Sequence, residues 1–594
     1  MARSVVAMFR HITRHLLVLV SIVMVVCFVG YMNNSKNALE SQSLRDTRLP
    51  LRQREFELDN RSSTEAEIMI SSTSTTTKDS NIWTPPGDLG YAVTLGSTED
   101  SVGKMVKLGY DSQGLNQYIS DLISVKRRLP DIRDEWCRQP GRYLPNLPAT
   151  SIVIVFYNEA WSVLVRTVHS ILDRSPAKLI KEIILVDDFS YLPHLKIQLE
   201  DYFLPYPKVR IVRAEERLGL MRARLLGARC ATADVLTFLD AHVECIEGWL
   251  EALLDPVARN WTTISIPTID WIDEHDLHLR SESAPQFYGA YDWDLNFGWW
   301  GRASRKIKYD NKFEPFDTPA MSGGLFAITR RFFEHVGWYD EGFEIYGVEN
   351  IELSMKSWMC GGKMMTVPCS RVAHIQKTGH PYMQQTSKDV VRANSLRLAE
   401  VWMDEYKHVI YDIYGIPKYP VDEIGELCSR REIRKRAKCK SFLYYVETAF
   451  PEMRNPMVEG AFRGEMKNKA LGNGFCLEYV KEENSLTMAR CDHQERNQYW
   501  THNYYRELNS RRNCIDYTGS GAVLVFGCHR ARGNQEWQNV NATGQFKSVK
   551  YGKCLAVDLT NNKTLTMENC DEKKDAQMWL VNLITLDVSI FAKT

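Results

Sequence analysis

Apolar segments alternate with amphipathic stretches between residues 151 and 243. Each apolar segment is rich in Ile, Val, Leu and Phe, and the stretches between them carry apolar residues at helical spacing. The apolar segments are 151–159, 182–190, 209–213 and 235–243, and the amphipathic stretches are 162–172 and 219–228. This alternation predicts an α/β domain with a parallel sheet and helices on both faces. No Gly-x-Gly-x-x-Gly or phosphate-loop motif follows the first strand, which argues against a dehydrogenase or a phosphate-loop kinase.

The last of these segments, 235–243, contains Asp240 and His242 near its end. In an extended chain, residues two apart project to the same side, so a carboxylate oxygen and an imidazole nitrogen can meet one ion. Oxygen and nitrogen ligands without thiolate suit Mn²⁺ or a similar divalent ion. The alternative to a metal site is that these two polar residues only cap the end of the strand. Open α/β sheets, however, bind ligands at the carboxyl ends of their strands. His374 also follows a short apolar run, and we predict it as the third ligand in preference to His380.

Charged residues near these strand ends suit a nucleotide. Asp188 follows the second strand and could hold a ribose or a base. The arginines that could meet a diphosphate are Arg217, Arg222 and Arg224, although each could also lie on a solvated helix face. The glycine pair 323–324 would let the backbone approach a ligand closely. An anionic sugar nucleotide that binds with a divalent ion gives all these groups one explanation.

The N-terminal segment is predicted to be a membrane anchor followed by a stem. Residues 16–32 are uncharged and follow a basic tail at 1–15, so the tail is predicted to stay cytosolic and the rest to enter the lumen. A cleaved signal peptide is the alternative, but no small-residue cleavage pattern follows the apolar run. Residues 33–115 show little apolar periodicity, which predicts a flexible stem.

The composition limits the partners and the compartment. The chain has 74 basic and 74 acidic residues, and this zero net charge argues against nucleic acid as a main partner. Its 14 cysteines fit an oxidising lumen. Together with the predicted anchor, these features indicate a membrane protein of the secretory pathway.

The C-terminal segment, 468–594, repeats one pattern three times after a linker at 451–467. Each repeat has a pair of cysteines and a Gln-x-Trp sequence, which predicts a three-lobed β-trefoil of the ricin-lectin type with one disulfide in each lobe. The predicted pairs are Cys476 with Cys491, Cys514 with Cys528, and Cys554 with Cys570. We expect the three tryptophans to pack in the core rather than to bind a ligand.

A sugar site in such a lobe needs a carboxylate that accepts from neighbouring hydroxyls, with donors at its edge. Only the second lobe has the full set, which consists of Asp516, His529 and Asn534. The first lobe has Glu478 without the matching histidine, and the third has Ala556 at the position of the acid. We therefore predict one sugar site, in the middle lobe.

From about residue 122 to its end, the chain resembles the polypeptide N-acetylgalactosaminyltransferases, type II Golgi membrane enzymes that start mucin-type O-glycans. The similarity rests on blocks that occur in the same order, at 157–160, 181–190, 219–222, 238–242, 368–374 and 399–407. The resemblance implies a GT-A fold for residues 116–450, UDP-GalNAc as the donor and Mn²⁺ as the cofactor. It also implies transfer to Ser or Thr hydroxyls with retention of configuration, and GalNAc on glycoproteins as the ligand of the middle lobe.

The resemblance also assigns roles to individual residues of this chain. The manganese ligands correspond to Asp240, His242 and His374. The donor contacts correspond to Asp188, Arg217, Gly324, Tyr346, Lys377 and Tyr382, the residues at the reacting centre to Glu349 and Asn350, and an acceptor contact to Trp299. No general base is assigned, because in a front-side displacement the acceptor hydroxyl would pass its proton to the departing phosphate. Two further disulfides are implied, Cys137 to Cys369 and Cys360 to Cys439, and the state of Cys230, Cys245 and Cys428 stays open.

The chain departs from the family pattern near the predicted site. Tyr-Gly-Val-Glu-Asn replaces the usual Trp-Gly-Gly-Glu-Asn, so the freedom of a glycine is lost at Val348. Gln376 and Lys377 replace a Phe and an Arg, which predicts weaker acceptor packing and a point charge in place of a two-pronged phosphate contact. The alternative function is therefore a weakly active or inactive relative that acts as a Golgi lectin or as a regulator of O-glycosylation. A retaining transferase that uses another UDP-sugar is the third.

Overall fold

The computed structural model describes residues 84–581 with gaps. The residues left out within this range are 97–99, 282–286, 303–310, 380–386, 415–423, 454–461, 482, 493–495, 504, 511–512, 521, 530, 541–542 and 561–563. The predicted anchor, most of the predicted stem, and Tyr382 lie outside the described residues. The described end of the predicted stem is folded, because Asp100–Gln113 form helix α2 and Val93 and Leu115 are buried in a core, so this part does not form the flexible segment that the sequence predicts. Within the described residues, every helix falls short of the length or the apolar character that a membrane span requires.

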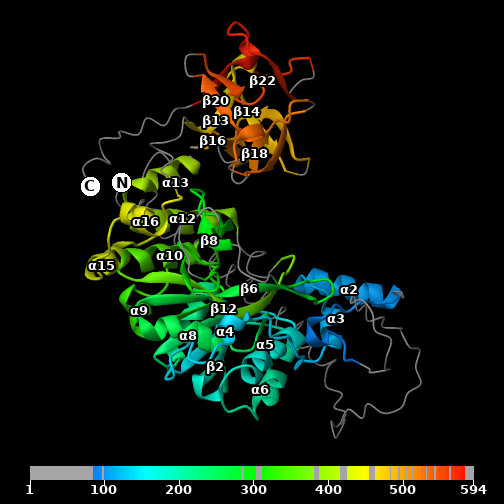
Figure 1. Ribbon diagram of the computed structural model, residues 1–594, viewed down its shortest axis with the longest axis vertical. Coiled ribbons are helices and arrows are strands. Elements are labelled where there is room, and N and C mark those ends of the chain that lie inside the picture. Colours follow the sequence, from blue (N-terminus) through cyan, green and yellow to red (C-terminus); the bar gives the residue numbers. More distant parts are fainter. Residues whose placement is uncertain are drawn as a thin grey trace, which may run out of the picture. The chain divides into compact units, whose positions relative to one another are not determined.

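A ten-stranded sheet forms the centre of the α/β domain (Figure 1). Its main path has the strand order β10-β12-β6-β11-β4-β1-β2-β3, while β5 pairs with β12 and β7 pairs with β6. The strands are β1 (Thr150–Phe156), β2 (Ile180–Asp187), β3 (Val209–Arg213), β4 (Val235–Asp240), β5 (Val243–Cys245), β6 (Thr263–Ile272), β7 (Leu279–Arg280), β10 (Phe316–Asp317), β11 (Phe326–Thr329) and β12 (Lys363–Ile375). A separate hairpin consists of β8 (Phe287–Tyr291) and β9 (Phe297–Gly301).

The strands predicted from the sequence, β1 to β4, form one parallel part of this sheet, and β6 with β12 forms another. β1 lies between β2 and β4, with Ile152 opposite Ile183 on one side and Thr237 on the other, and β3 pairs with β2. Every residue of β1 is buried, which explains its unbroken run of apolar and small residues.

The prediction of a parallel sheet is wrong for part of it. β11 runs antiparallel to its neighbours β4 and β6, and β5, β7 and β10 also pair antiparallel. β4 ends at Asp240, and Phe326 at the start of β11 pairs with Phe238 near that end. The chain therefore enters β11 at the edge where β4 finishes. This direction brings Gly323 and Gly324, which precede β11, to the edge of the sheet that carries Asp240.

Helices cover both faces of the sheet, as the sequence predicts. Ile152 and Ile154 of β1 pack in a core with α5 (Trp161–Asp173), α6 (Ile197–Phe203) and α8 (Trp249–Arg259). Val153 and Val155 pack in the other core, with α7 (Leu220–Cys230), α10 (Glu349–Met359) and α12 (Lys388–Trp402). The remaining α-helices are α2 (Asp100–Gln113), α3 (Gln117–Leu122), α4 (Glu135–Arg138), α9 (Arg330–His335), α13 (Lys407–Ile413), α15 (Cys428–Arg436) and α16 (Phe442–Ala449).

The C-terminal repeats fold into short antiparallel strands around one core. The strands are β13 (Phe462–Asn468), β14 (Phe475–Val480), β15 (Ser485–Arg490), β16 (Tyr499–His502), β17 (Leu508–Ser510), β18 (Asn513–Asp516), β19 (Leu524–Gly527), β20 (Trp537–Val540), β21 (Gln545–Ser548), β22 (Lys553–Val557), β23 (Leu565–Asn569) and β24 (Trp579–Val581). Trp500, Trp537 and Trp579 are buried, and each donates from Nε1 to a carbonyl of its own lobe at 2.8–3.0 Å. The tryptophans are therefore core residues, as predicted.

Disulfides join all five predicted cysteine pairs. The bonds are Cys137–Cys369, Cys360–Cys439, Cys476–Cys491, Cys514–Cys528 and Cys554–Cys570. Among the described residues the free cysteines are Cys230, Cys245 and Cys428. Burial raises the pKa of the Cys245 thiol to about 12, so this thiol is protonated and inert.

Candidate active site

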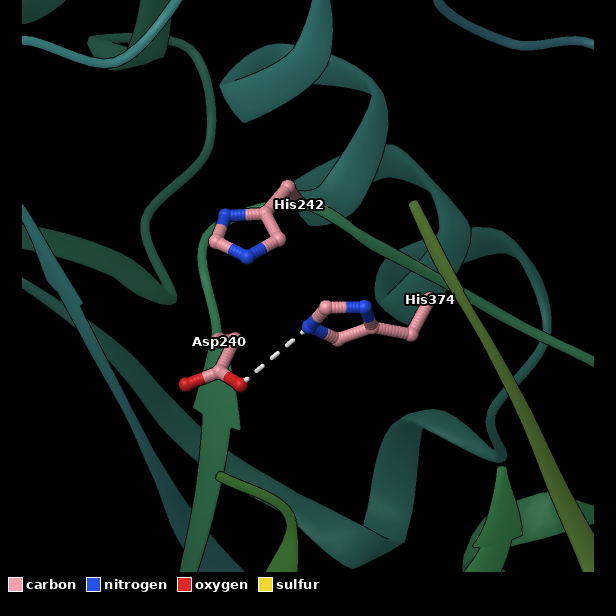
Figure 2. A group of neighbouring side chains, drawn as sticks. All are labelled: Asp240, His242 and His374. Carbon is pink, nitrogen blue, oxygen red and sulfur yellow. Dashed lines mark ion pairs between the residues drawn. The ribbon is translucent and has the colours of Figure 1, made fainter. Parts of the chain in front are cut away.

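Asp240, His242 and His374 lie together at one edge of the sheet (Figure 2). Asp240 ends β4, His242 follows two residues later, and His374 lies opposite Val243 where β12 pairs with β5. One ligand atom from each of the three side chains lies within 4.8 Å of the others. Nε2 of His374 is 3.5 Å from Oδ2 of Asp240, and the two imidazole centroids are 4.7 Å apart. The sheet therefore gathers the three residues that the sequence predicts as ligands.

The charge states of this cluster suit a metal ion. Burial alone would raise the pKa of Asp240, but the His374 and Arg224 side chains outweigh it and hold the pKa well below its usual range. Burial, and then the positive charge of Lys377, lower the pKa of His242. The acid is therefore ionised and this imidazole is neutral near pH 7, which are the forms that bind a divalent ion.

Glu159 fixes the orientation of His242. Its Oε2 atom lies 3.0 Å from Nδ1 of His242. Burial would raise the pKa of Glu159, but Lys377 and His242 outweigh it and lower the pKa to about 2, so the carboxylate can only accept hydrogen bonds. His242 therefore donates from Nδ1, and its Nε2 keeps the lone pair that a metal ion needs.

Two further observations fit an ion at this position. Nδ1 of His374 is buried and has no hydrogen-bond partner among the described residues. Gly324 passes so close to Asp240 that a Cβ atom at this glycine would lie 2.0 Å from Oδ2 of the acid. One carboxylate and two imidazoles are a suitable donor set for Mn²⁺ and related divalent ions.

Beside this cluster, Arg224 lies between Asp240 and Glu349, the first residue of α10. Nη2 of Arg224 is 3.3 Å from Oδ1 of Asp240, and its Nη1 is 3.8 Å from Oε1 of Glu349. Burial raises the pKa of Glu349, and Arg224 opposes this shift. Nη1 of Arg224 and Oγ of Ser322 are buried without a hydrogen-bond partner among the described residues, so both are available to a ligand. Arg222, two residues earlier, makes a solvent-exposed ion pair instead.

Asp188 and Arg217 are bound to each other at the turn after β2. Asp188 accepts from Arg217 and from the backbone N–H groups of Leu218 and Gly219, at 2.8 and 3.2 Å for the latter two. The guanidinium of Arg217 lies 3.6 Å from the centre of the Tyr157 ring. Tyr157 also lines the cavity that opens on the metal-ligand cluster. The pair therefore shapes the turn beside that ring, and its contact with uridine stays a prediction.

A cavity of about 940 Å³ opens on the metal-ligand cluster. The predicted site residues that line it are Asp240, His242, Trp299, Gly324, Tyr346, Glu349 and His374. Trp271, Phe287 and Trp299, which also line it, are 55%, 46% and 45% exposed. The metal-ligand cluster and the partly exposed aromatic rings line one cavity, which suits a nucleotide sugar together with a peptide chain.

Other predicted site residues are placed differently. Asn350 donates from Nδ2 to the carbonyl of Met321 at 2.9 Å, so it supports the segment that precedes the glycine pair. Nζ of Lys377 lies 2.5 Å from Oε1 of Glu159 instead of facing the cavity. The sequence analysis did not single out Glu159 or Trp271, because their roles depend on contacts between distant segments.

Val348, which replaces the second glycine of the family pattern, keeps a glycine-like backbone. It precedes α10 with φ 60° and ψ 3°, and its side chain is buried. The left-handed conformation costs an L-residue about 1–2 kcal/mol, and a β-branched residue rarely adopts it. The chain therefore retains the geometry that places Glu349 at the start of the helix, at some cost in stability.

This strain gives a stability prediction. Gly is usually about 0.5–1 kcal/mol less favourable than Ala in regular structure, but at Val348 only Gly relieves the left-handed strain. Both substitutions lose the two γ-methyl groups of the valine, and the relief of strain in Val348→Gly should offset the further loss of Cβ. Val348→Gly is therefore expected to be at least as stable as Val348→Ala. Urea unfolding of the two variants measures the difference. A glycine variant that is clearly the less stable of the two would contradict the strained conformation.

In the middle lobe, the three predicted residues form one hydrogen-bonded group. Asn534 donates from Nδ2 to Oδ2 of Asp516 at 2.6 Å, and Oδ1 of Asn534 is 3.2 Å from Nε2 of His529. Oδ1 of Asp516 has no partner among the described residues and remains available to a sugar hydroxyl. On the neighbouring strand Leu524 pairs with Asp516, which puts Phe526, 50% exposed, on the same face. The ring suits the apolar face of a sugar, and the sequence analysis did not identify it.

Three segments of the chain match known families. Residues 151–337 match Glycosyl transferase family 2, and residues 304–381 match the N-terminal domain of galactosyltransferase. Residues 462–579 match the Ricin-type beta-trefoil lectin domain. The α/β domain is thus a GT-A glycosyltransferase domain, and the C-terminal domain is a ricin-type β-trefoil.

Relatives extend this similarity to most of the chain. Polypeptide N-acetylgalactosaminyltransferase 5 of Caenorhabditis elegans is 42% identical over 504 residues, which are 83% of this chain and 79% of the relative. Polypeptide N-acetylgalactosaminyltransferase 10 of Homo sapiens is 38% identical over 494 residues, 80% of each chain. The crystal structure of GalNAc-T7 with UDP, GalNAc and Mn²⁺ matches with a TM-score of 0.67 and 30% identity, and the match covers 88% of this chain and 99% of that one.

Proposed function

Because the chain belongs to the polypeptide N-acetylgalactosaminyltransferase family, we propose that it transfers GalNAc from UDP-GalNAc to Ser and Thr hydroxyls of proteins, with retention of configuration. The observation that carries this proposal is the cluster of Asp240, His242 and His374 in a cavity that aromatic residues also line. This arrangement offers a diphosphate site and a peptide site next to each other.

Different residues would serve different parts of this reaction. Asp240, His242 and His374 would hold a divalent ion such as Mn²⁺, which would neutralise the negative charge that develops on the leaving diphosphate. Arg224 and Glu349 offer a buried donor and a buried acceptor for the hydroxyls of the sugar. The acceptor hydroxyl attacks from the side of the leaving group and gives its proton to the departing phosphate, so no protein base is required.

The function is tested with UDP-GalNAc and a panel of Ser/Thr peptides and GalNAc-peptides, with Mn²⁺ and with a chelator. We expect transfer that requires the metal ion. Absence of transfer to every acceptor, with GalNAc still bound by the β-trefoil, would favour the alternative of a lectin or a regulator. Faster turnover with another UDP-sugar would contradict the donor assignment.

We place the catalytic part in the Golgi lumen, anchored by residues 16–32. The five disulfides and the uncharged N-terminal run support this location. Protease treatment of sealed membrane vesicles from expressing cells tests it. The catalytic part is expected to resist digestion until detergent is added, and digestion of intact vesicles would contradict the topology.

The middle lobe is expected to direct the enzyme to partly glycosylated acceptors. Asp516→Ala removes the carboxylate that accepts from the sugar, so transfer to GalNAc-peptides should fall about tenfold while transfer to unglycosylated peptides is unchanged. The matched control is Glu478→Gln in the first lobe, whose carboxylate accepts from Nε2 of Gln498 at 2.7 Å. Initial rates on both acceptor classes measure the effect. Equal loss on both classes would count against a lectin role.

A further inference from the structure

Glu159 joins His242 to Lys377 in a buried contact next to the metal-ligand cluster. Its Oε2 atom lies 3.0 Å from Nδ1 of His242, and its Oε1 atom lies 2.5 Å from Nζ of Lys377. The side chains of Glu159 and Lys377 are only 6% and 4% exposed. Oε1 also accepts from the N–H of Ala160 at 3.2 Å. Little solvent can replace any of these partners.

The backbone around Lys377 is held independently of this contact. The N–H of Thr378 donates to the carbonyl of Gly114 at 2.9 Å, and the N–H of Gln376 donates to the carbonyl of Ile272 at 3.0 Å. These bonds fix the chain on both sides of Lys377. Its side chain thus reaches Glu159 from a backbone that the sheet and the α2–α3 connection already position.

We propose that Lys377 is a positioning residue for the metal site and acts through Glu159 on His242. The ion pair keeps the Glu159 carboxylate turned so that it receives the Nδ1–H of His242. This hydrogen bond leaves Nε2 of His242 as the ring nitrogen that binds the ion. The inference rests on the proposed function, because it needs a divalent ion held by Asp240, His242 and His374.

The geometry favours this role over a direct phosphate contact. A lysine that bound the diphosphate would have its ammonium in the cavity, whereas Lys377 is absent from the cavity lining in the described structure and Glu159 is part of it. Removing the Lys377 charge would leave a buried carboxylate with one partner fewer, which is costly. The Glu159 carboxylate would then lose the ion pair that helps to hold it toward His242, and it would turn away from that ring.

The test measures Mn²⁺ binding to the full chain without nucleotide, by electron paramagnetic resonance of the free ion. Groups that orient a metal-ligating histidine typically change metal affinity 10- to 100-fold, so Glu159→Gln and Lys377→Met should each weaken binding by about that factor. Since Glu159 and Lys377 act through one contact, the double variant should bind Mn²⁺ no more weakly than Glu159→Gln alone. Lys377→Arg should restore binding. Lys363→Met, which removes a half-exposed lysine at the start of the same strand β12, is the control and should bind as the wild type does.

Three results would overturn the proposal. Unchanged Mn²⁺ affinity in Lys377→Met, together with weaker UDP binding, would make Lys377 a diphosphate contact and overturn the inference. Additive losses in the double variant would also overturn it, because they would show separate roles. Failure of the wild-type chain to bind Mn²⁺ would overturn the metal site as well as the inference. If the wild-type chain binds Mn²⁺ normally and the variants do not behave as predicted, the inference alone fails. Thermal unfolding identifies a variant that fails to fold. In that case the Mn²⁺ affinity of Lys377→Arg, compared with that of the wild type, tests the proposal.

Discussion

Asp240→Asn is expected to lower GalNAc transfer by about 10³-fold or more, because a bound metal ion supplies several kcal/mol of transition-state stabilisation. The amide keeps the size of the side chain but loses the charge that would face the ion. It also leaves Arg224, 3.3 Å away, without its anionic partner at the metal site. Initial rates with UDP-GalNAc, a Ser/Thr peptide and saturating Mn²⁺ measure the loss.

A matched control separates this effect from a general loss of charge. Asp317 on β10 is half-exposed and 3.8 Å from Lys363, so Asp317→Asn should leave transfer unchanged. GalNAc binding by the middle lobe should also persist in Asp240→Asn, because the β-trefoil has its own core. An Asp240→Asn enzyme that keeps much of the wild-type rate would contradict the role of this residue as a metal ligand.

Glu349→Gln should reduce kcat/KM for transfer by about 10²-fold, since a buried carboxylate that accepts from hydroxyls makes charge-assisted hydrogen bonds. The substitution keeps the shape of the first residue of α10 but removes the counter-charge of Arg224, 3.8 Å away. Steady-state kinetics with UDP-GalNAc measure the loss. The affinity for UDP, which lacks the GalNAc, should stay the same.

Glu344→Gln is the control for this variant, because Glu344 precedes the same helix but makes an exposed ion pair with Arg222. It should behave as the wild type. Equal losses of UDP affinity and of kcat/KM in Glu349→Gln would mean that the residue supports the nucleotide site and does not act on the sugar.

The local patterns of the sequence were sufficient to predict strands β1 to β4 and the three C-terminal lobes. Each of these features depends on a short segment, such as the buried run of β1 or the Gln-x-Trp of each repeat. The antiparallel strand β11 was missed because its direction depends on which edge the chain reaches after the β8–β9 hairpin. A short apolar segment carries no information about direction.

The site residues, like the strands, were predictable only where a short segment of the sequence indicates them. Asp240 and His242 were predictable because they share one strand end, and His374 was predictable from its place after a second apolar run. Glu159 and Lys377 could not be paired in advance, because 218 positions separate them and only the folded sheet brings them together. Helical spacing could not decide whether Arg222 or Arg224 faces the site. Arg222 pairs with an exposed glutamate and Arg224 pairs with Asp240, and these partners are known only from the fold.

The central claim is that one acid and two imidazoles from separate parts of the chain hold a divalent ion on which the donor diphosphate binds. Its most direct measurement is the anomalous scattering of manganese in crystals of the protein grown with UDP and Mn²⁺. The account predicts one strong peak in contact with Asp240, His242 and His374 and with the diphosphate. A peak bound elsewhere, or none at these three side chains while UDP is present, would contradict it.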